Sequence, residues 1–398
     1  MRLFHKEKEA KDLLKATYDK GVLTIELPEK VDTSDIDDVK AAIDQLLRQY
    51  KAKSLILNAE HLSYISSVGL RLVLSLQKSL PSFSIIEVSP EAYNIFEMTG
   101  FTNICNIKKA LRTVSIEGCP IIGEGAYGKV YRLSPDTIVK HYYRGGTVEE
   151  IERERENAKQ AFILGVPTAI SYDVVKVKEG GYGAIYEMIE AESLKSLIEK
   201  HPENLDSYIA LNAKLLKTLN QTEVVAPLPK ATDIISDWMK RIKPLFQKEE
   251  YNHLKDLVAT IPESNHLVHG DCHFKNIFIQ GDEAILIDMD SLQVGPNIVE
   301  YADLYVAYVA YNLDDPTNTE RFFHIKKDIC DRLFFDTVRK VYQGRDDVDN
   351  IIRKITVLAL IHFLSKMLIE DKNPELNRIP NNVARLLSLS KDLDTLEY

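Results

Sequence analysis

The 398-residue sequence predicts two folded parts, an α/β domain at the N-terminus and a larger α+β domain of two lobes. Strand-like and helix-like apolar patterns alternate up to about residue 114. They are followed by a glycine-rich segment near residue 121 and by a polar cluster near residue 270 that leads into an apolar, hairpin-like run. The sequence divides near Arg112–Gly118, and a hydrophobic content of 45% is enough to fill more than one core.

The N-terminal part has the pattern of a small α/β sandwich. Strands are predicted at Val22–Leu27, Leu55–Leu57 and Phe83–Val88. Apolar residues at helical spacing predict one helix behind Thr33 and Ser34, and a second helix is predicted between Tyr64 and about Lys78. We therefore expect a mixed sheet with helices packed on it.

The glycine-rich segment places Gly123, Gly125 and Gly128 between two strand-like stretches. Because glycine has no Cβ, this backbone can close over phosphate groups without a clash. A turn at Ser134–Asp136 precedes the next predicted strand, which ends at Lys140. We expect the Lys140 ammonium to contact phosphate oxygens.

A helix that follows offers a partner for Lys140. Thr147 and Glu150 form a capping-box pattern that opens this helix, and it is predicted to run to about Gly165. Three glutamates compete for the role: Glu152, Glu154 and Glu156. At about 100° per residue, Glu154 falls on the apolar face of the helix and the other two do not. We expect Glu154 to pair with Lys140, the alternative being an ordinary solvated charge.

The polar cluster His269–Asn276 has the residue types that phosphoryl transfer requires. This reaction needs a carboxylate near the attacking hydroxyl and oxygen ligands for magnesium. Asp271 would orient the acceptor's proton, while Asn276 and Asp288 would hold metal. Between them, Ile277–Ile287 is typical of two short strands around a Gly-Asp turn, which would bring Asp288 back toward Asn276.

Together these residues resemble the protein-kinase-like superfamily, most closely its branch of aminoglycoside phosphotransferases and choline kinases. The resemblance covers about Ser115 to the C-terminus. It implies a kinase-like domain at 115–398, with a small lobe at about 115–192 and a helical lobe at about 193–398. It implies ATP and Mg as cofactors, Lys140, Glu154 and Asp271 as catalytic residues, and Asn276 and Asp288 as metal ligands. It also implies these nucleotide-binding residues: Gly123, Gly125, Gly128, Val130, Lys140, Glu187 and Ile189, the last two in a hinge that contacts adenine.

The sequence departs from typical protein kinases near the catalytic cluster. Gly270 replaces the arginine before the catalytic aspartate, and Asp288 is followed by Met289 and Asp290 rather than Phe-Gly. The resemblance then favours a constitutively assembled site of the small-molecule kinase type, although the glycine-rich segment is closer to that of protein kinases. Asp290 is either a further metal or acceptor contact or a cap of the turn.

The roles of four other residues can also be considered: three of them have two possible roles each, and the fourth has a structural role. His273 contacts phosphate or fills the turn, and Cys272 is oxidation-sensitive or simply small and unreactive. Trp238 lies where kinases of this resemblance bind the acceptor, but a core anchor is the simpler role. Asp303 resembles a position that buttresses the catalytic loop, and we expect it to be structural.

The segments Ile65–Leu70 and Met98–Ile104 resemble the STAS domain of anti-sigma-factor antagonists, over nearly all of residues 1–114. In that family a serine at a helix start is phosphorylated, and the added charge switches the partner. A gapless match places Val68 at that position, so Ser67 or Ser66 would have to be the phospho-acceptor. The alternative is that both serines cap the helix. The resemblance implies a protein partner in either case.

Charge and termini restrict the class further. A net charge of −10, with basic residues interspersed among acidic ones, argues against a nucleic-acid partner. The charged segment Met1–Lys8 does not resemble a secretion signal, and the apolar stretch 355–369 is too short for a bilayer. The four cysteines lack metal or disulfide spacing, so we expect a reduced, cytoplasmic protein.

The sequence thus predicts a Mg-ATP-dependent phosphotransferase with a regulatory or partner-docking STAS domain, acting on a hydroxyl of a small molecule or protein. Two alternatives stay open. One is a Ser/Thr protein kinase that acts in anti-sigma partner switching, and the other is an ATP-binding pseudokinase that serves as a scaffold.

Overall fold

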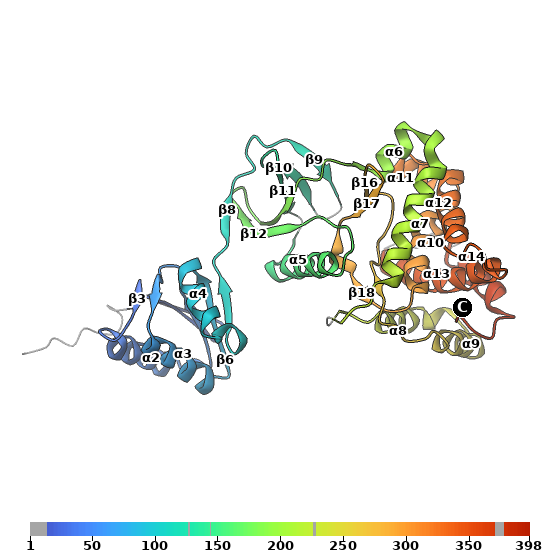
Figure 1. Cartoon of the computed structure of the whole chain (residues 1–398). Helices are drawn as coiled ribbons and strands as arrows, with labels where there is room; N and C mark the ends of the chain where they lie inside the picture. Colours follow the sequence, from blue (N-terminus) through green and yellow to red (C-terminus); the bar gives the residue numbers. More distant parts are fainter. Residues whose placement is uncertain (1–13, 126–127, 144, 226–227, 371–377) are drawn as a thin grey trace, which may run out of the picture. The chain divides into compact units, whose positions relative to one another are not determined.

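The computed structural model describes residues 14–398 except 126–127, 144, 226–227 and 371–377. The chain divides into two compact units, with the boundary between Thr113 and Val114 (Figure 1). Within the described ranges, no helix combines the length and the apolar character needed to cross a membrane. The charged segment Met1–Lys8 lies outside the described residues.

The N-terminal unit is built on a mixed five-stranded sheet. In spatial order its strands are β1 (Ala16–Asp19), β2 (Val22–Glu26), β4 (Ser54–Asn58), β6 (Ser82–Val88) and β7 (Asn106–Lys109). β1 pairs antiparallel with β2, and the later neighbours pair in parallel. A separate short pair is formed by β3 (Lys30–Val31) and β5 (Tyr64–Ile65). The helices are α2 (Ile36–Tyr50), α3 (Ser67–Ser79) and α4 (Pro90–Met98). The expected mixed sheet with helices is therefore confirmed.

Alternation along the strands places the core of this unit. Leu55 and Leu57 on β4 are buried, as are Leu23 and Ile25 on β2. Helix α2 begins after Asp35, slightly later than the sequence pattern suggested, because the Ser34 hydroxyl and amide both bind the Asp32 carboxylate.

The second unit begins with a lobe that contains a six-stranded sheet. In spatial order the strands are β8 (Arg112–Val114), β12 (Ser171–Val177), β13 (Tyr182–Glu187), β11 (Thr137–Tyr142), β10 (Lys129–Arg132) and β9 (Ile121–Glu124). Helix α5 (Val148–Ile163) packs on β12 and β13 (Figure 1). It opens with a capping box in which Thr147 Oγ1 accepts from the Glu150 amide and the Glu150 carboxylate accepts from the Thr147 amide.

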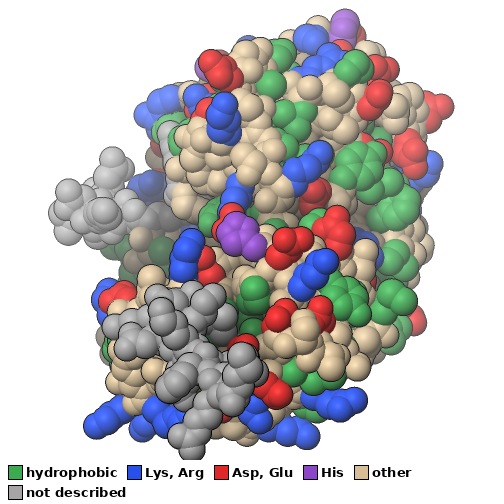
Figure 2. All heavy atoms as spheres, turned by 90° about the vertical axis from the view of Figure 1, so that its left-hand side faces the viewer, with side chains coloured by type: hydrophobic (Ala, Val, Ile, Leu, Met, Phe, Trp, Pro, Cys, Tyr) green, Lys and Arg blue, Asp and Glu red, His purple; other side chains and the backbone are tan. Residues whose placement is uncertain are grey.

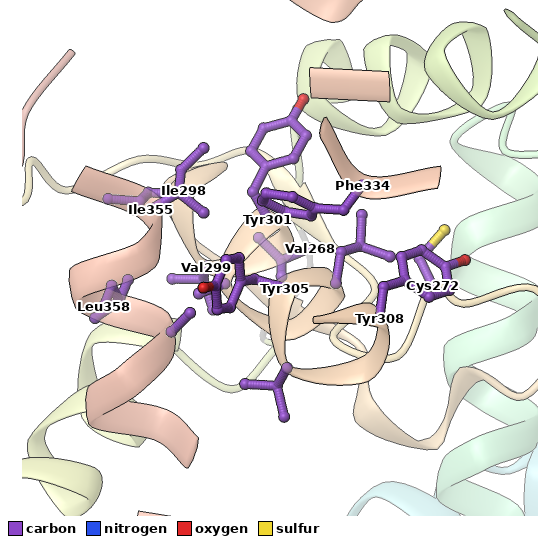
Figure 3. Packing of buried hydrophobic residues seen from close by; sticks show 14 of the residues in the cluster. Val268, Cys272, Ile298, Val299, Tyr301, Tyr305, Tyr308, Phe334, Ile355 and Leu358 are labelled. Carbon is purple, nitrogen blue, oxygen red and sulfur yellow. The ribbon is translucent and has the colours of Figure 1, made fainter. Parts of the chain in front are cut away.

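The larger lobe is helical. Its helices are α6 (Leu194–Lys200), α7 (Leu205–Gln221), α8 (Ala231–Ile242), α9 (Lys248–Ala259), α10 (Ile298–Tyr308), α11 (Asn318–Phe323), α12 (Lys327–Val341), α13 (Val348–Glu370) and α14 (Arg378–Ser390). The buried helix α10 packs between α12 and α13, and its three tyrosines lie in the core with Phe334 of α12 (Figure 3). Helix α13 is longer than the predicted stretch 355–369, and α14 follows it.

A hairpin places the predicted polar residues at the junction of the two lobes. It consists of β16 (Ile277–Gln280) and β17 (Glu283–Leu286), and β14 (Glu192–Ser193) adds to β16. Another short antiparallel pair is formed by β15 (Leu267–Val268), just before the polar cluster, and β18 (Gln293–Val294), just after the turn that follows Asp288. The Leu286 amide donates to the Pro167 carbonyl at 2.8 Å, which ties the hairpin to the small lobe.

Candidate active site

Lys140 is held between two carboxylates at the junction of the lobes. Its Nζ lies 2.8 Å from Glu154 Oε1 on α5 and 2.7 Å from Asp288 Oδ1, just after β17. Burial by itself would lower the pKa of Lys140, but the two carboxylates outweigh it and raise that pKa above its ordinary value. The ammonium therefore stays charged, and its side chain is still 22% exposed, so a phosphate oxygen can reach it.

Two tyrosines that the sequence interpretation missed hold Glu154 in place. The Tyr142 hydroxyl donates to Glu154 Oε2 at 2.6 Å, and the Tyr186 hydroxyl donates to Oε1 at 3.1 Å. Burial raises the pKa of both phenols, so both remain donors. Strand alternation could have found Tyr142, since it lies two residues beyond Lys140 and so on the same face of β11.

The loop at residues 269–276, which we call the catalytic loop after its predicted role, brings Asp271 and Asn276 together. Asn276 Nδ2 donates to the Asp271 carbonyl at 2.9 Å and to its Oδ2 at 2.8 Å. The Ile287 amide donates to the Asn276 carbonyl at 2.9 Å, so the segment that leads into Asp288 is tied to this loop. Buried His269 accepts from the Asp271 amide at Nδ1 and donates from Nε2 to the Ile287 carbonyl. Burial lowers the pKa of His269, which fits a neutral ring in this tautomer.

Glu300, which the sequence interpretation did not single out, buttresses the loop. Its Oε2 accepts from the amides of His269 at 2.5 Å and Gly270 at 3.4 Å, and the residue is fully buried on α10. Burial first, and then the Asp303 charge, raise the pKa of Glu300 to about 8. Gly270 has a φ of +78°, and an added Cβ would lie 2.9 Å from the Ser291 carbonyl oxygen, so no arginine fits there.

Asp303 has a structural contact, as expected, but Glu300 rather than Asp303 accepts the hydrogen bonds from the loop amides. Asp303 lies one helical turn beyond Glu300, and its Oδ1 is 2.8 Å from Nδ1 of His362 on α13. The ring of His362 in turn stacks on Trp238, with centroids 4.1 Å apart. Trp238 itself is 6% exposed and belongs to the core of the helical lobe, in keeping with the simpler of its two expected roles.

Asp288 adopts a backbone conformation that is uncommon for a residue with a side chain. Its φ and ψ are both 68°, in the left-handed region, and such conformations concentrate at functional sites. The 3-10 turn Met289–Ser291 follows, and Asn157 on α5 donates to the Met289 carbonyl at 2.9 Å. Asp290 accepts from the Ser291 hydroxyl at 3.1 Å, and partial burial, then Asp288, raise the pKa of Asp290 to about 6. Both expected roles of Asp290, as a metal or acceptor contact and as a cap of the turn, stay predictions.

The protonation states around Asp271 suit a general base. Its partial removal from water raises the pKa of Asp271 to about 6, against the opposing effect of His269, and the Asp288 charge adds to the rise. Burial and the nearby charge of Lys275 lower the pKa of His273 to about 4. His273 Nε2 lies 3.4 Å from Asp271 Oδ1, so this neutral ring is a neighbour of the carboxylate.

The glycine-rich segment forms the outer hairpin of the small-lobe sheet. Gly123 pairs with Val130, and the Gly125 amide donates to the Gly128 carbonyl at 2.9 Å, while residues 126–127 lie outside the described residues. A Cβ on Gly128 would come within 2.1 Å of the His141 carbonyl oxygen, so only glycine fits. A cavity of about 360 Å³ borders the hinge, where Glu187 and Ile189 line it. Its lining residues outside the hinge come from the end of α5, the segment after it and the hairpin, and none comes from the glycine-rich strands. The nucleotide-binding roles thus stay predictions.

The oxygen atoms offered by Asn276 and Asp288 fit magnesium. The contacts to Asp271 use both amide hydrogens of Asn276, which leaves its Oδ1 as a ligand atom, and Asp288 contributes a carboxylate. The described residues contain no group of three or more His, Cys, Asp or Glu side chains that could hold a metal. Two oxygen ligands suffice for Mg, because this ion usually keeps several waters and substrate phosphates as ligands.

The two candidate phospho-acceptor serines have different environments. Ser66 is the N-cap of α3, and its Oγ accepts from the Gly69 amide at 3.4 Å, whereas the next residue, Ser67, is exposed. Val68 packs against the core of the N-terminal unit. The cap interpretation therefore applies to Ser66, and Ser67 is the accessible hydroxyl.

Comparison with known proteins agrees with the fold of both units. The sequence model of the STAS domain matches residues 14–114, and that of the phosphotransferase enzyme family matches residues 119–324. A thermostable mutant of aminoglycoside phosphotransferase APH(4)-Ia, in ternary complex with ADP and hygromycin B, has a similar structure, with a TM-score of 0.50, 11% identity, and coverage of 75% of this chain and 97% of that one.

A choline/ethanolamine kinase family protein from Mesorhizobium loti aligns with a TM-score of 0.45 and 16% identity over 68% of this chain and 87% of that one. No curated protein is a significant match in sequence.

The second unit thus has the bilobal fold of a kinase-like phosphotransferase. The chain belongs to the phosphotransferase enzyme family, and its N-terminal unit is a STAS domain.

Proposed function

We propose that the chain is a Mg-ATP-dependent phosphotransferase that acts on a hydroxyl group. The observation that carries the proposal is the position of Lys140, within 2.8 Å of Glu154 and 2.7 Å of Asp288, next to a loop in which Asn276 orients Asp271. Phosphoryl transfer depends mostly on positioning and charge neutralisation, and this constellation supplies both.

Each residue has a defined part in the proposed reaction. The oxygen of the acceptor hydroxyl bonds to the γ-phosphorus of ATP while the Asp271 carboxylate accepts the hydroxyl proton. The bond between the γ-phosphorus and the oxygen that remains on ADP breaks. Lys140 offsets charge on the phosphates, and Glu154 orients it. Asn276 and Asp288 would hold Mg, which neutralises phosphate charge when bound. For the STAS domain we propose a docking role for a partner protein, which rests on the exposed Ser67 at the start of α3.

The exposed Ser67 also favours a second candidate, a kinase that phosphorylates a STAS serine in partner switching. The two candidates differ in the product. A small-molecule kinase leaves the chain at its original mass, whereas the partner-switching kinase adds the mass of a phosphate to its own or another STAS domain.

The test measures ATP turnover by the full chain with Mg, followed by intact-mass analysis. The Asp271→Asn variant is expected to lose turnover by about 100-fold or more while it still binds nucleotide, because it removes the base and little volume. Asp282→Asn, in the exposed turn of the hairpin, is the matched control and is expected to behave as wild type. Equal turnover by wild type and Asp271→Asn would refute the proposal. ATP binding without turnover, with candidate acceptors supplied, would favour the scaffold.

A further inference from the structure

A cavity of about 230 Å³ opens beside Asp271 in the helical lobe and is separate from the cavity at the hinge. The loop at residues 269–276 contributes one wall, and α10, α11 and α13 contribute further walls through residues that include Asp303, Phe323, His362 and Lys366. Because Asp271 is the proposed base, an acceptor hydroxyl has to enter here. The volume lies below the range of about 300–1,000 Å³ that is common for drug-sized ligands, so the cavity fits a small acceptor.

The carboxylates of this cavity are not available to a cationic acceptor. Its two acidic lining residues are Asp271 and Asp303. Asp303 already lies 2.8 Å from His362 Nδ1, and its side chain is only 9% exposed. Asp271 is needed for the chemistry, so the lining residues leave no carboxylate to bind an ammonium group.

Cationic side chains also lie at this cavity. Lys366 lies four residues beyond His362 on α13, so the two side chains share one face of that helix. Lys366 Nζ lies 5.9 Å from the ring centroid of Tyr311, another lining residue. At the wall formed by Phe323, Lys275 Nζ lies 4.3 Å from the ring centroid. Lys366 and His362 thus line the cavity, and Lys275 lies against the aromatic ring of one of its walls.

We propose that this cavity binds a small hydroxy compound that carries an oxyanionic group, a carboxylate or a phosphate, and that Lys366 binds this group. The proposal rests on the proposed phosphotransferase function and names its substrate class. Lys366 binds the oxyanion, the stacked and paired His362 shapes the same wall, and the acceptor hydroxyl faces Asp271. Aromatic side chains cover the remaining carbon atoms of the ligand.

The test uses four probes of similar size: glycerate, glycerol 3-phosphate, glycerol and ethanolamine. Binding to the full chain is measured by ligand-observed NMR, and turnover by ADP release with Mg-ATP. The two anions are expected to bind about tenfold or more tightly than glycerol and ethanolamine, the size of a charge-assisted hydrogen bond. Lys366→Met is expected to remove this preference, and Lys366→Glu to shift it toward ethanolamine, a gain that misfolding would not produce. Lys340→Met, at an exposed position of α12, is the matched control and keeps the preference.

Several outcomes would overturn the proposal. These are equal binding of all four probes, tighter binding of ethanolamine or glycerol, an unchanged preference in Lys366→Glu, or no binding of either anion at millimolar concentration. Failure of the phosphotransferase function gives a different result. In that case the anions bind with the Lys366-dependent preference, but wild type, like Asp271→Asn, produces no ADP with any acceptor.

Discussion

Lys140 and Asp288 are 148 residues apart in the sequence, yet their charged atoms Nζ and Oδ1 lie 2.7 Å apart. Lys140 lies on a strand of the small lobe, and Asp288 follows the hairpin of the helical lobe, so this ion pair joins the two lobes. The same ammonium also neutralises Glu154, which is 5% exposed. One cation thus compensates one fully buried carboxylate and orients another that is proposed to bind Mg.

We expect Lys140→Met to lower the free energy of unfolding by about 3 kcal/mol, because it leaves Glu154 buried without its cation. Adding Glu154→Gln should recover part of this loss, since the buried charge is then gone. Urea unfolding followed by the fluorescence of Trp238, the only tryptophan, reports on the helical lobe of the same unit. Lys159→Met is the control, because its side chain is 62% exposed. A double variant less stable than Lys140→Met would contradict this account.

The pH dependence of turnover should report on Asp271. With a pKa of about 6, this carboxylate is a base only above that pH, so kcat/KM is expected to fall about tenfold per unit below pH 6 at saturating Mg. Asp290 has a pKa raised to about 6 as well, so Asp290→Asn is the necessary comparison. The acid limb should persist in that variant, and its disappearance would assign the limb to Asp290 instead.

Glu300→Gln is expected to make stability less dependent on pH. The ordinary pKa of 4.5 is raised to about 8 in the folded protein, so folding favours the protonated carboxyl, and the wild type loses this contribution as the pH rises from about 4.5 through 8. Glutamine resembles the protonated form and does not titrate. Relative to wild type, the variant should therefore gain at least about 1 kcal/mol between pH 5.5 and pH 8.5 in urea unfolding. A constant difference across this range would show that Glu300 does not titrate as expected.

Ser66 and Ser67 should respond differently to substitution. Ser66→Ala removes the cap of α3 and is expected to cost about 1 kcal/mol, measured as a roughly fivefold faster hydrogen exchange of the amides in its first turn. Ser67→Ala, at an exposed position outside the cap bond, should change exchange little. The reverse order would show that Ser67 is the capping residue.

Among the described residues on the face shown in Figure 2, Lys and Arg side chains are interspersed with acidic and apolar ones. This mixture matches the way basic residues are interspersed among acidic ones in the sequence, whose net charge is −10. Lys366, on which the substrate inference depends, instead lines a cavity of the helical lobe.

Much of the site could be predicted from local patterns. Helical periodicity selected Glu154 over its two neighbours, because a buried partner has to lie on the apolar face of α5, and that face is visible in the sequence. Three other features could also be predicted because each is visible within a short stretch of sequence. These are the glycine spacing, the strand near Lys140 and the hairpin between Asn276 and Asp288. Glu300 and Tyr186 could not be found in this way, because each acts on a residue more than thirty positions away.

The sequence by itself determined the two units, the order of their elements and the residue types of the candidate site, since these depend on short-range periodicity and turn chemistry. Only the tertiary structure decided which of the two carboxylates on α10, Glu300 or Asp303, supports the catalytic loop. Because α10 packs under the catalytic loop, Glu300 accepts the hydrogen bond from the His269 amide, whereas Asp303 contacts His362. The two acids are only one helical turn apart. That choice depends on how α10 and α13 are oriented in the core, and the orientation is set by the packing of many side chains at once rather than by any local pattern.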